Sequence, residues 1–408
     1  MGMKRVVATS LIVLLFMLST AGSLVATPSP SYLKSINVTP KGASSVAQYQ
    51  TAEPIIIRSN SDFALFGATG VGTPSDPYRF ENLAISTNLT CIDVEATTAY
   101  FVISNCRLEA NGVFGAILFT NVENGRVVNC EIIDATYGIT VIDSVDISIE
   151  NTTIYDMDYG IYLSRVSNST IIGCTTFYNY RGIVLERTDH CQIRDNLIYA
   201  NWQYGIEIAL FSHNNSVYGN SIGWNDIINE NMYNVIDTGE DNYFDDNVSI
   251  GNYWSDFNES ESYVIPGAAN SVDSFAQLLE DDVNPILVPL YDTAIDVESV
   301  GNTLTWSAYD VFPRSYVIAE NAQDRIFSVW LGGEITMGLD HLAVGTYTIT
   351  IIITDGAGNE ASDEILVSVV SFVLGGIGTE LVMIASGLTV ASFVIIIILS
   401  KKLTRKVR

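Results

Sequence analysis

The sequence predicts an all-β protein that consists of a parallel β-helix, a β-sandwich and one transmembrane helix. Three observations lead to this prediction. A glycine-headed motif recurs at intervals of 22 or 23 residues between Gly115 and Gly205. The repeat stops near residue 280, and strand-like runs separated by turns continue to residue 370. Residues 381–399 form an uncharged apolar run of 19 residues, about the length that crosses a bilayer.

The N-terminus has the features of a secretory signal over residues 1–26. Lys4 and Arg5 give a basic start, Leu11 to Leu18 give a short apolar core, and small residues follow. An uncleaved N-terminal anchor is the alternative, although the apolar core is short for a span. Residues 27–50 are expected to be a linker.

The repeat occupies residues 51–280, the predicted β-helix. Its strings are GAILF, GITVI, GIYLS, GIVLE and GIEIA, which begin at Gly115, Gly138, Gly160, Gly182 and Gly205. Alternation along each string predicts short strands whose apolar residues point inward. Coils of a solenoid stack about 4.8 Å apart, so equivalent residues form continuous buried rows. Two inward rows are expected, Ile139–Ile161–Ile183–Ile206 and Val141–Leu163–Leu185–Ile208.

A second string in step with the first predicts a stack of polar or sulfur-bearing side chains at one turn. It comprises Cys106, Cys130, Thr152, Thr175, Asn196 and Asn220. Such a ladder satisfies the backbone groups of the turn inside the fold.

These repeats, the entry EPIIIRSNSDF and the exit element GNYWSDF (Gly251 to Phe257) resemble the NosD family and the related carbohydrate-binding and sugar-hydrolase domains. The resemblance covers about residues 50–278. It implies a right-handed, single-stranded parallel β-helix. It also raises the question of copper, whose ligands in proteins are mostly His, Cys and Met. The three histidines, His190, His213 and His341, do not form a ligand cluster in the sequence, and we expect no metal and no cofactor.

Residues 281–370 lack the repeat and predict a small β-sandwich. The order TWSAYD, then GTYTITIIITDGAGNE, resembles the immunoglobulin-like modules of bacterial and archaeal surface proteins. Trp306 and Tyr347 are expected to be core or corner residues. The module is expected to be a stalk, followed by a linker at 371–379.

The transmembrane helix is predicted at residues 380–400, followed by a basic tail at 401–408. Five of the eight tail residues are Lys or Arg. Positive residues next to a span stay in the cytoplasm, so the N-terminal domains are expected outside a single-pass cell-membrane protein.

Composition narrows the range of partners. The formal net charge is −27 at pH 7, which disfavours nucleic acid. The five cysteines lack CxxC spacing and are expected to be buried free thiols. Seven Asn-x-Ser/Thr sequons are candidate glycosylation sites in an exported chain: Asn37, Asn88, Asn151, Asn168, Asn214, Asn247 and Asn258.

A column of aromatic residues makes glycan recognition the leading functional hypothesis. Tyr155, Tyr178 and Tyr199 recur at intervals of 23 and 21 residues, with Asp134 and Asp156 at nearby turns. Stacked rings suit sugars, and carboxylates can accept hydrogen bonds from hydroxyls. The same column could instead only stabilise coil stacking. Further tyrosines precede the repeat glycines at Tyr137, Tyr159 and Tyr204.

Two other functions remain open at the level of sequence. Glycoside hydrolysis needs two carboxyl groups, and a polysaccharide lyase needs a base together with charge neutralisation of its substrate. Acids and arginines near Arg181 and Arg187 give the best neighbourhood for either reaction, but no catalytic residue can be selected. The leading hypothesis of non-catalytic recognition includes a surface-layer neighbour as well as a glycan, and a purely structural envelope protein is the remaining alternative.

Overall fold

The computed structural model describes residues 49–111, 115–225, 233–258 and 261–371. The predicted signal (1–26), the predicted span (380–400) and the tail (401–408) lie outside the described residues. No helix among the described residues has the length and apolarity required to span a bilayer.

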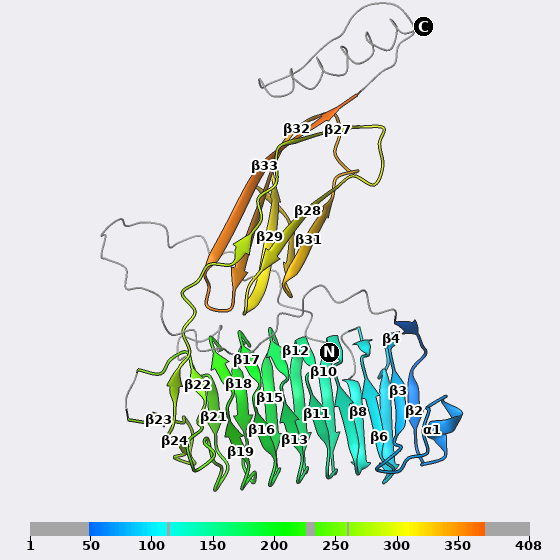
Figure 1. Cartoon of the computed structure of the whole chain (residues 1–408), viewed down its shortest axis with the longest axis vertical. Coiled ribbons are helices and arrows are strands. Elements are labelled where there is room, and N and C mark those ends of the chain that lie inside the picture. Colours follow the sequence, from blue (N-terminus) through cyan, green and yellow to red (C-terminus); the bar gives the residue numbers. More distant parts are fainter. Residues whose placement is uncertain (1–48, 112–114, 226–232, 259–260, 372–408) are drawn as a thin grey trace, which may run out of the picture. The chain divides into compact units, whose positions relative to one another are not determined.

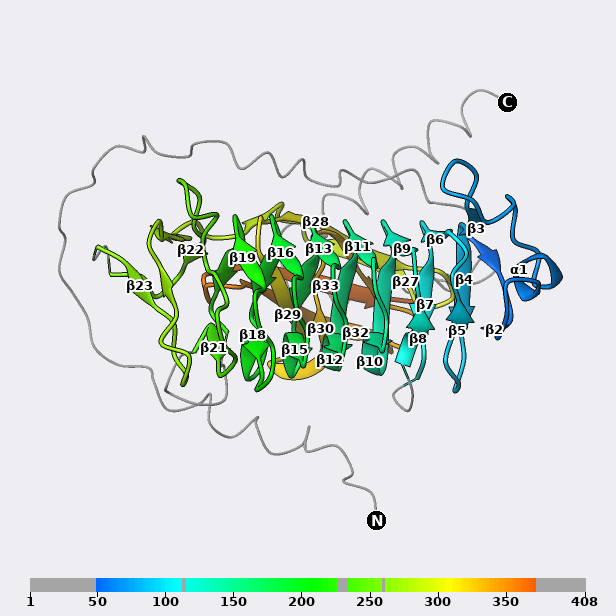
Figure 2. The same ribbon diagram turned by 90° about the horizontal axis from the view of Figure 1, so that it is seen from below.

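The first part of the described chain is a parallel β-helix (Figures 1 and 2). Each coil adds one strand segment to each of three faces, and equivalent strands pair in parallel from coil to coil. Face 1 contains β1 (Gln50–Thr51), β4 (Leu83–Ser86), β7 (Arg107–Glu109), β10 (Glu131–Ile142), β12 (Thr153–Ser164), β14 (Thr175–Phe177), β17 (Leu197–Tyr199), β20 (Ser221–Gly223), β22 (Tyr253–Trp254) and β25 (Gln277–Leu278). Face 2 contains β2 (Ile55–Ile57), β5 (Ile92–Thr97), β8 (Gly115–Val122), the second halves of β10 and β12, β15 (Arg181–Glu186), β18 (Tyr204–Ile208) and β21 (Val235–Asp237). Face 3 contains β3 (Tyr78–Glu81), β6 (Phe101–Ser104), β9 (Gly125–Val128), β11 (Ser148–Glu150), β13 (Thr170–Ile172), β16 (Gln192–Arg194) and β19 (Ser216–Tyr218).

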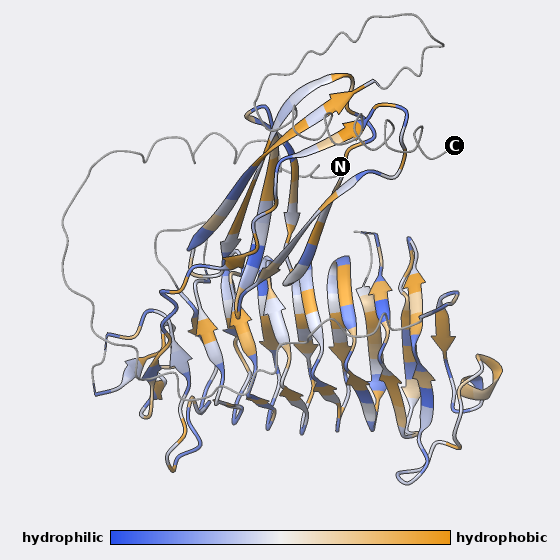
Figure 3. Cartoon of the chain, turned by 45° about the horizontal axis from the view of Figure 1, so that its top comes forward, coloured by the Kyte–Doolittle hydropathy of each residue, from blue (hydrophilic) through white to orange (hydrophobic). Residues whose placement is uncertain are grey.

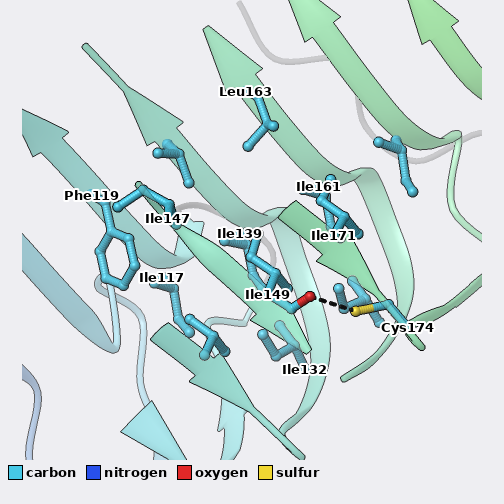
Figure 4. Packing of buried hydrophobic residues seen from close by; sticks show 14 of the residues in the cluster. Ile117, Phe119, Ile132, Ile139, Ile147, Ile149, Ile161, Leu163, Ile171 and Cys174 are labelled. Atoms are coloured by element: carbon cyan, nitrogen blue, oxygen red, sulfur yellow. Dashed lines mark hydrogen bonds between the residues drawn. The ribbon is translucent and has the colours of Figure 1, made fainter. Parts of the chain in front are cut away.

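The inside of the coils is a continuous apolar core, as the sequence predicted. Hydrophobic and hydrophilic residues alternate along the strands (Figure 3). Ile139, Ile161 and Leu163 meet the isoleucines of face 3 in this core (Figure 4). The first predicted inward row, Ile139–Ile161–Ile183–Ile206, is in register and fully buried. The second row, Val141–Leu163–Leu185–Ile208, is likewise in register and at most 1% exposed. Both predicted rows are therefore confirmed.

The repeat glycines lie where consecutive coils approach most closely. A Cβ atom at Gly160 would lie 2.5 Å from the carbonyl oxygen of Gly182, and one at Gly182 would lie 2.5 Å from that of Gly205. No side chain fits at that distance, so the close approach of consecutive coils requires glycine at these positions.

The predicted ladder is present, with one correction. Its fourth member is Cys174, because the backbone N–H of Cys174 donates to Asn196 Oδ1 at 2.8 Å, whereas Thr175 is the first residue of β14. The ladder continues past Asn220 to Asn252, whose Oδ1 accepts from the Asn220 N–H at 3.1 Å. All five cysteines are free and buried, and the Cys174 thiol donates to the Ile149 carbonyl at 3.5 Å (Figure 4).

Both ends of the β-helix core are closed by aromatic residues. At the first coils, the short helix α1 (Asp62–Leu65) places the buried Phe63 against Tyr78, with ring centroids 4.6 Å apart. At the last coils, the indole of Trp254 stacks on Tyr263 at 4.3 Å and donates to Asp273 at 2.9 Å. The hairpin of β23 (Tyr263–Val264) and β24 (Val272–Asp273) supplies these two partners.

The second part of the described chain contains two sheets that share one apolar core. The smaller sheet contains β26 (Ile286–Leu287), β28 (Thr303–Tyr309) and β31 (Gly333–Gly338). The larger sheet contains β27 (Thr293–Asp296), β29 (Pro313–Glu320), β30 (Gln323–Val329), β32 (Gly345–Asp355) and β33 (Glu360–Val370). The buried Trp306 of the smaller sheet packs in one cluster with Ile349, Ile351 and Val367 of the larger sheet. We call this part the second domain.

Candidate functional site

The predicted tyrosine column on face 1 is buried. Tyr155 and Tyr199 are 8% and 1% exposed, and the ring between them in register is Phe177, not Tyr178. The prediction of Tyr178 was wrong because consecutive coils are 22 residues apart here, and not 23 and 21. Tyr178 therefore lies in the turn that follows, with a φ of 57°. The three rings stack with centroids 5.3 and 5.1 Å apart.

The second domain contacts the last ring of this column. Phe312 lies edge-on to Tyr199 at 5.6 Å and to Trp224 at 5.0 Å, and the Tyr199 hydroxyl donates to the Pro313 carbonyl at 2.7 Å. A Cβ atom at Gly356 would lie 2.7 Å from the Tyr199 ring, so the contact is close. The column points outward, as predicted, but its rings pack inside the chain and are not available to a ligand.

Asp134 and Asp156 were predicted at turns, but they occupy equivalent positions within β10 and β12, where the parallel pairing skips one residue. Both have positive φ values, 50° and 62°. Asp and Asn tolerate this left-handed conformation better than most residues. The backbone conformation alone therefore explains why aspartate occupies both positions. Asp156 is exposed and Asp134 is partly exposed.

The sequon asparagines within the described residues are all exposed: Asn88, Asn151, Asn168, Asn214, Asn247 and Asn258. Asn37 lies outside the described residues. Glycosylation at these positions stays a prediction.

A second column, on face 2, is partly exposed. Tyr137, Tyr159, Arg181 and Tyr204 pair in register along β10, β12, β15 and β18. Each precedes a repeat glycine, and the strand pairing passes from Tyr137 directly to Ile139 without including the glycine. This irregularity turns the tyrosine outward while the isoleucine stays inside. The Tyr137 and Tyr159 rings are stacked, 4.9 Å apart and 8° from parallel.

Tyr162 extends this column sideways. Its ring meets those of Tyr137 and Tyr159 edge-on at 5.9 and 5.8 Å, and its hydroxyl donates to Glu186. Burial, with the Glu186 carboxylate as a further cause, raises the pKa of Tyr162 to about 12. The hydroxyl is therefore protonated and a donor at neutral pH.

Arg181 is surrounded by partners. Its guanidinium lies 5.4 Å from the centroid of Tyr159, its Nε donates to Gln203 at 2.7 Å, and its Nη1 lies 2.8 Å from Glu207 Oε2. Burial raises the pKa of Glu207, although Arg181 opposes the shift. The arginine thus stiffens the column and has its charge compensated.

An open groove of about 370 Å³ begins beside Glu186. Its lining comprises Glu186, Arg187, Glu207, Ala209, Leu210, Phe211 and Thr238. Leu210 and Phe211 are 60% and 68% exposed, and the Arg187 guanidinium lies 5.9 Å from the Phe211 ring. We define the face 2 column, Tyr162 and this groove together as the tyrosine–arginine face.

Tyr137, Tyr159 and Tyr204 were visible in the sequence beside the repeat glycines but were not among the predicted site residues. The signal was present in the repeat, because the residue before the glycine reads Tyr, Tyr, Arg and Tyr in four consecutive coils. The paired carboxylates Glu186 and Glu207 carried no such signal, since they occupy different positions within their coils.

Three aspartates form the one group in the described residues whose ligand atoms could surround a metal ion. Carboxylate oxygens of Asp281, Asp310 and Asp355 lie within 4.8 Å of one another. Asp355 is fully buried and accepts from the Asn359 backbone and side chain, whereas the Oδ2 atom of Asp281 is buried without a hydrogen-bond partner. Burial and the two neighbouring carboxylates raise the pKa of Asp281 to about 6.

This repulsion predicts a pH-dependent gain from Asp281→Asn. When an acid has a higher pKa in the folded than in the unfolded protein, its ionisation destabilises the folded state. Here that loss of protein stability occurs as the pH rises from about 4 to about 6. In the presence of a chelator, the variant should therefore be more stable than the parent at pH 7.5, by on the order of 1 kcal/mol after solvent screening. At pH 4 the difference should vanish. Thermal unfolding at both pH values checks this, and an equal gain at pH 4 would mean that charge repulsion is not the cause.

The β-helix part of the chain matches one protein-family model. Residues 57–259 match the family model described as periplasmic copper-binding protein (NosD). The β-helix is therefore similar to the NosD family over these residues. Its GNYWSDF element holds Asn252, which ends the ladder, and Trp254, which closes the core. A comparison with curated proteins found no match.

Solved structures similar to this chain include two mannuronan C-5 epimerase A-modules of Azotobacter vinelandii. The AlgE4 module is 17% identical over 47% of this chain and 54% of its own length, with a TM-score of 0.35. The AlgE6 module is 16% identical over 52% and 58%, with a TM-score of 0.36. The enzymatically active domain of bacteriophage CBA120 tailspike protein 2 is 11% identical over 70% and 60%, with a TM-score of 0.33. This chain spans less than two thirds of each, and likenesses this low transfer no activity to its β-helix.

Proposed function

We propose that this chain is a cell-surface protein that recognises a glycan through the tyrosine–arginine face without cleaving it. The observation that carries the proposal is the stack of Tyr137 on Tyr159, two partly exposed rings continued in register by Arg181. The outward edges of the two rings offer apolar contact to the C–H groups of a sugar, and nearby carboxylates accept hydrogen bonds from its hydroxyls. Glu186 and Glu207 supply such carboxylates in the adjoining groove.

The proposed setting is the outer surface of a membrane. The apolar run at residues 381–399 and the basic tail support a single C-terminal span with the β-helix outside. The second domain serves as an immunoglobulin-like stalk in this proposal. One feature supports that assignment: the Tyr347 hydroxyl donates to the carbonyl of Ala343, four residues upstream, at 3.0 Å. A comparable tyrosine corner is common in immunoglobulin-type domains.

Replacing Tyr159 tests the proposal. Tyr159→Ala removes one ring of the stacked pair and the platform under Arg181, so glycan affinity should fall by about tenfold. Titration calorimetry of the full chain in detergent, with the glycan that binds best in an array, measures this change. The matched control is Tyr291→Ala, since Tyr291 is 92% exposed outside the face and should leave affinity unchanged. Equal affinity of Tyr159→Ala and the parent protein would remove the face from the proposal.

Hydrolysis of the glycan is the second candidate, because two carboxylates line the groove and burial raises the pKa of Glu207. A raised pKa suits a general acid, and glycoside hydrolases pair an acid with a second carboxylate. If new reducing ends appear with the parent protein and disappear with Glu207→Gln, the protein is an enzyme. Unsaturated uronate products would instead indicate a lyase.

Copper, which the family description names, has little support in the described residues. Copper prefers imidazole, thiolate and thioether ligands. Cys91, Cys174 and Cys191 are buried, and burial raises the pKa of each thiol to about 12. His190 lies beside Asp189 at 2.9 Å, and His341 lies in the second domain beside Glu320 at 3.0 Å. These donors do not converge on one centre.

A further inference from the structure

We infer that the groove takes an uncharged, hydroxyl-rich sugar residue stacked on Phe211, and that the site discriminates against polyuronates. This inference rests on the proposed function and specifies its ligand class. It follows from three features of the groove: the charges on its lining, the capacity of its carboxylates to accept hydrogen bonds, and the turn that carries Phe211.

The positive charge near the groove is already compensated. Arg181, the guanidinium of the column, lies 2.8 Å from Glu207 and donates to Gln203. Within the lining itself, Glu207 is the partner of Arg181. This leaves Glu186 and Arg187 as the other charged groups, and the Arg187 guanidinium lies over the Phe211 ring. A chain of uronate carboxylates would meet one acid and one base there, on a protein of net charge −27. Electrostatics therefore favour a neutral ligand.

The carboxylates of the groove retain capacity to accept hydrogen bonds. Glu207 lines the groove, and its Oε2 atom is buried in an ion pair with Arg181 Nη1 at 2.8 Å. A carboxylate has two oxygens and accepts several hydrogen bonds, so ligand hydroxyls can still donate to this side chain. Glu186 accepts one hydrogen bond, from Tyr162, and a carboxylate can accept several. Hydroxyl groups are the donors that an uncharged sugar offers in abundance.

The turn that carries Phe211 is longer than its equivalents. Leu185 pairs with Ile208, and Asp189 pairs with His213 in the next coil. Asp189 lies four positions after Leu185, but His213 lies five positions after Ile208. The coil before has the shorter spacing, from Leu163 to Ser167. The longer turn presents Leu210 and Phe211 at the groove.

Phe211 is an unusual residue for its conformation. Its φ is 66°, in the left-handed region that bulky side chains rarely adopt, while its ring is 68% exposed. The fold gains little burial from that ring. An exposed aromatic side chain held in an unfavourable backbone conformation beside a groove is suited to contact a ligand.

The test compares neutral and acidic glycans on the full chain in detergent. The probes are soluble glucan, mannan and galactan, together with polygalacturonate and polymannuronate. We expect at least one neutral glycan to bind, with affinity unchanged in 0.5 M NaCl, and both polyuronates to bind at least tenfold more weakly (a tenfold ratio being about 1.4 kcal/mol). Phe211→Ala should weaken the neutral glycan by about fivefold to tenfold. The matched control is Phe327→Ala, at a phenylalanine that is 60% exposed on the second domain, and it should leave the affinity for the neutral glycan unchanged.

Glu207→Gln supplies a gain-of-binding measurement. This variant keeps the size of the side chain but leaves Arg181 uncompensated, so affinity for polyuronates should rise. Stronger binding of a polyuronate than of every neutral glycan by the parent protein would overturn this inference and leave glycan recognition in place. Unchanged neutral-glycan affinity in Phe211→Ala would overturn the groove as the site. Binding of no probe at all would remove the inference and the proposed function together.

Discussion

Asn201→Leu is expected to destabilise the β-helix by about 3–5 kcal/mol, because it leaves several buried polar groups without partners. Asn201 is fully buried. Its Oδ1 accepts from the backbone and side chain of Asn179 at 3.1 and 3.0 Å, and its Nδ2 donates to the Thr176 carbonyl at 3.1 Å. Leucine has a similar volume but satisfies none of these groups.

Denaturant unfolding followed by far-ultraviolet circular dichroism measures this loss. The control is Asn284→Leu, since Asn284 is exposed in the segment before β26 and should change stability by less than about 0.5 kcal/mol. If Asn201→Leu unfolds at the same denaturant concentration as the parent, the hydrogen bonds between Asn179 and Asn201 do not contribute to the stability of these turns.

Trp254→Ala is expected to cost about 3–5 kcal/mol, the usual range for truncating a buried aromatic side chain. Trp254 is fully buried, stacks on Tyr263 and donates to Asp273. Its removal opens the last coil and exposes the end of the apolar core. Asp273, which also accepts from the Asn252 backbone at 2.7 Å, would lose one of its donors.

Trp254→Phe separates packing from hydrogen bonding at this position. Phenylalanine retains the stacking on Tyr263 and loses the N–H, so the loss should be on the order of 1–2 kcal/mol. Chemical denaturation of both variants gives the two values. A loss as large for Phe as for Ala would assign the stability to the Asp273 bond and not to closure of the core.

The fold followed from the sequence because a solenoid repeats one local pattern. Ile139 and Ile161 had to share a row, since the interval between the glycines and the alternation of a strand left one register for them. The ladder was predicted with one error, Thr175 for Cys174, because the last residue of the turn and the first residue of β14 are both small and polar or sulfur-bearing.

The site was harder to predict because exposure depends on parts of the chain far apart in sequence. Tyr199 is more than 100 residues from Pro313, to which its hydroxyl donates, and no periodicity in the β-helix reports that contact. The tyrosine–arginine face combines a column that the repeat does reveal with Glu207 and Phe211, which depend on pairing between coils and on one longer turn. The local sequence pattern therefore predicts the column but does not predict which residues line the groove.

The most direct test of the account is a crystal structure of the protein bound to a neutral oligosaccharide. We predict one sugar ring over Tyr137 and Tyr159 and another in the groove, stacked on Phe211 with hydroxyls on Glu186 and Glu207. An oligosaccharide bound elsewhere, with the rings of Tyr137, Tyr159 and Phe211 all uncontacted, would contradict it.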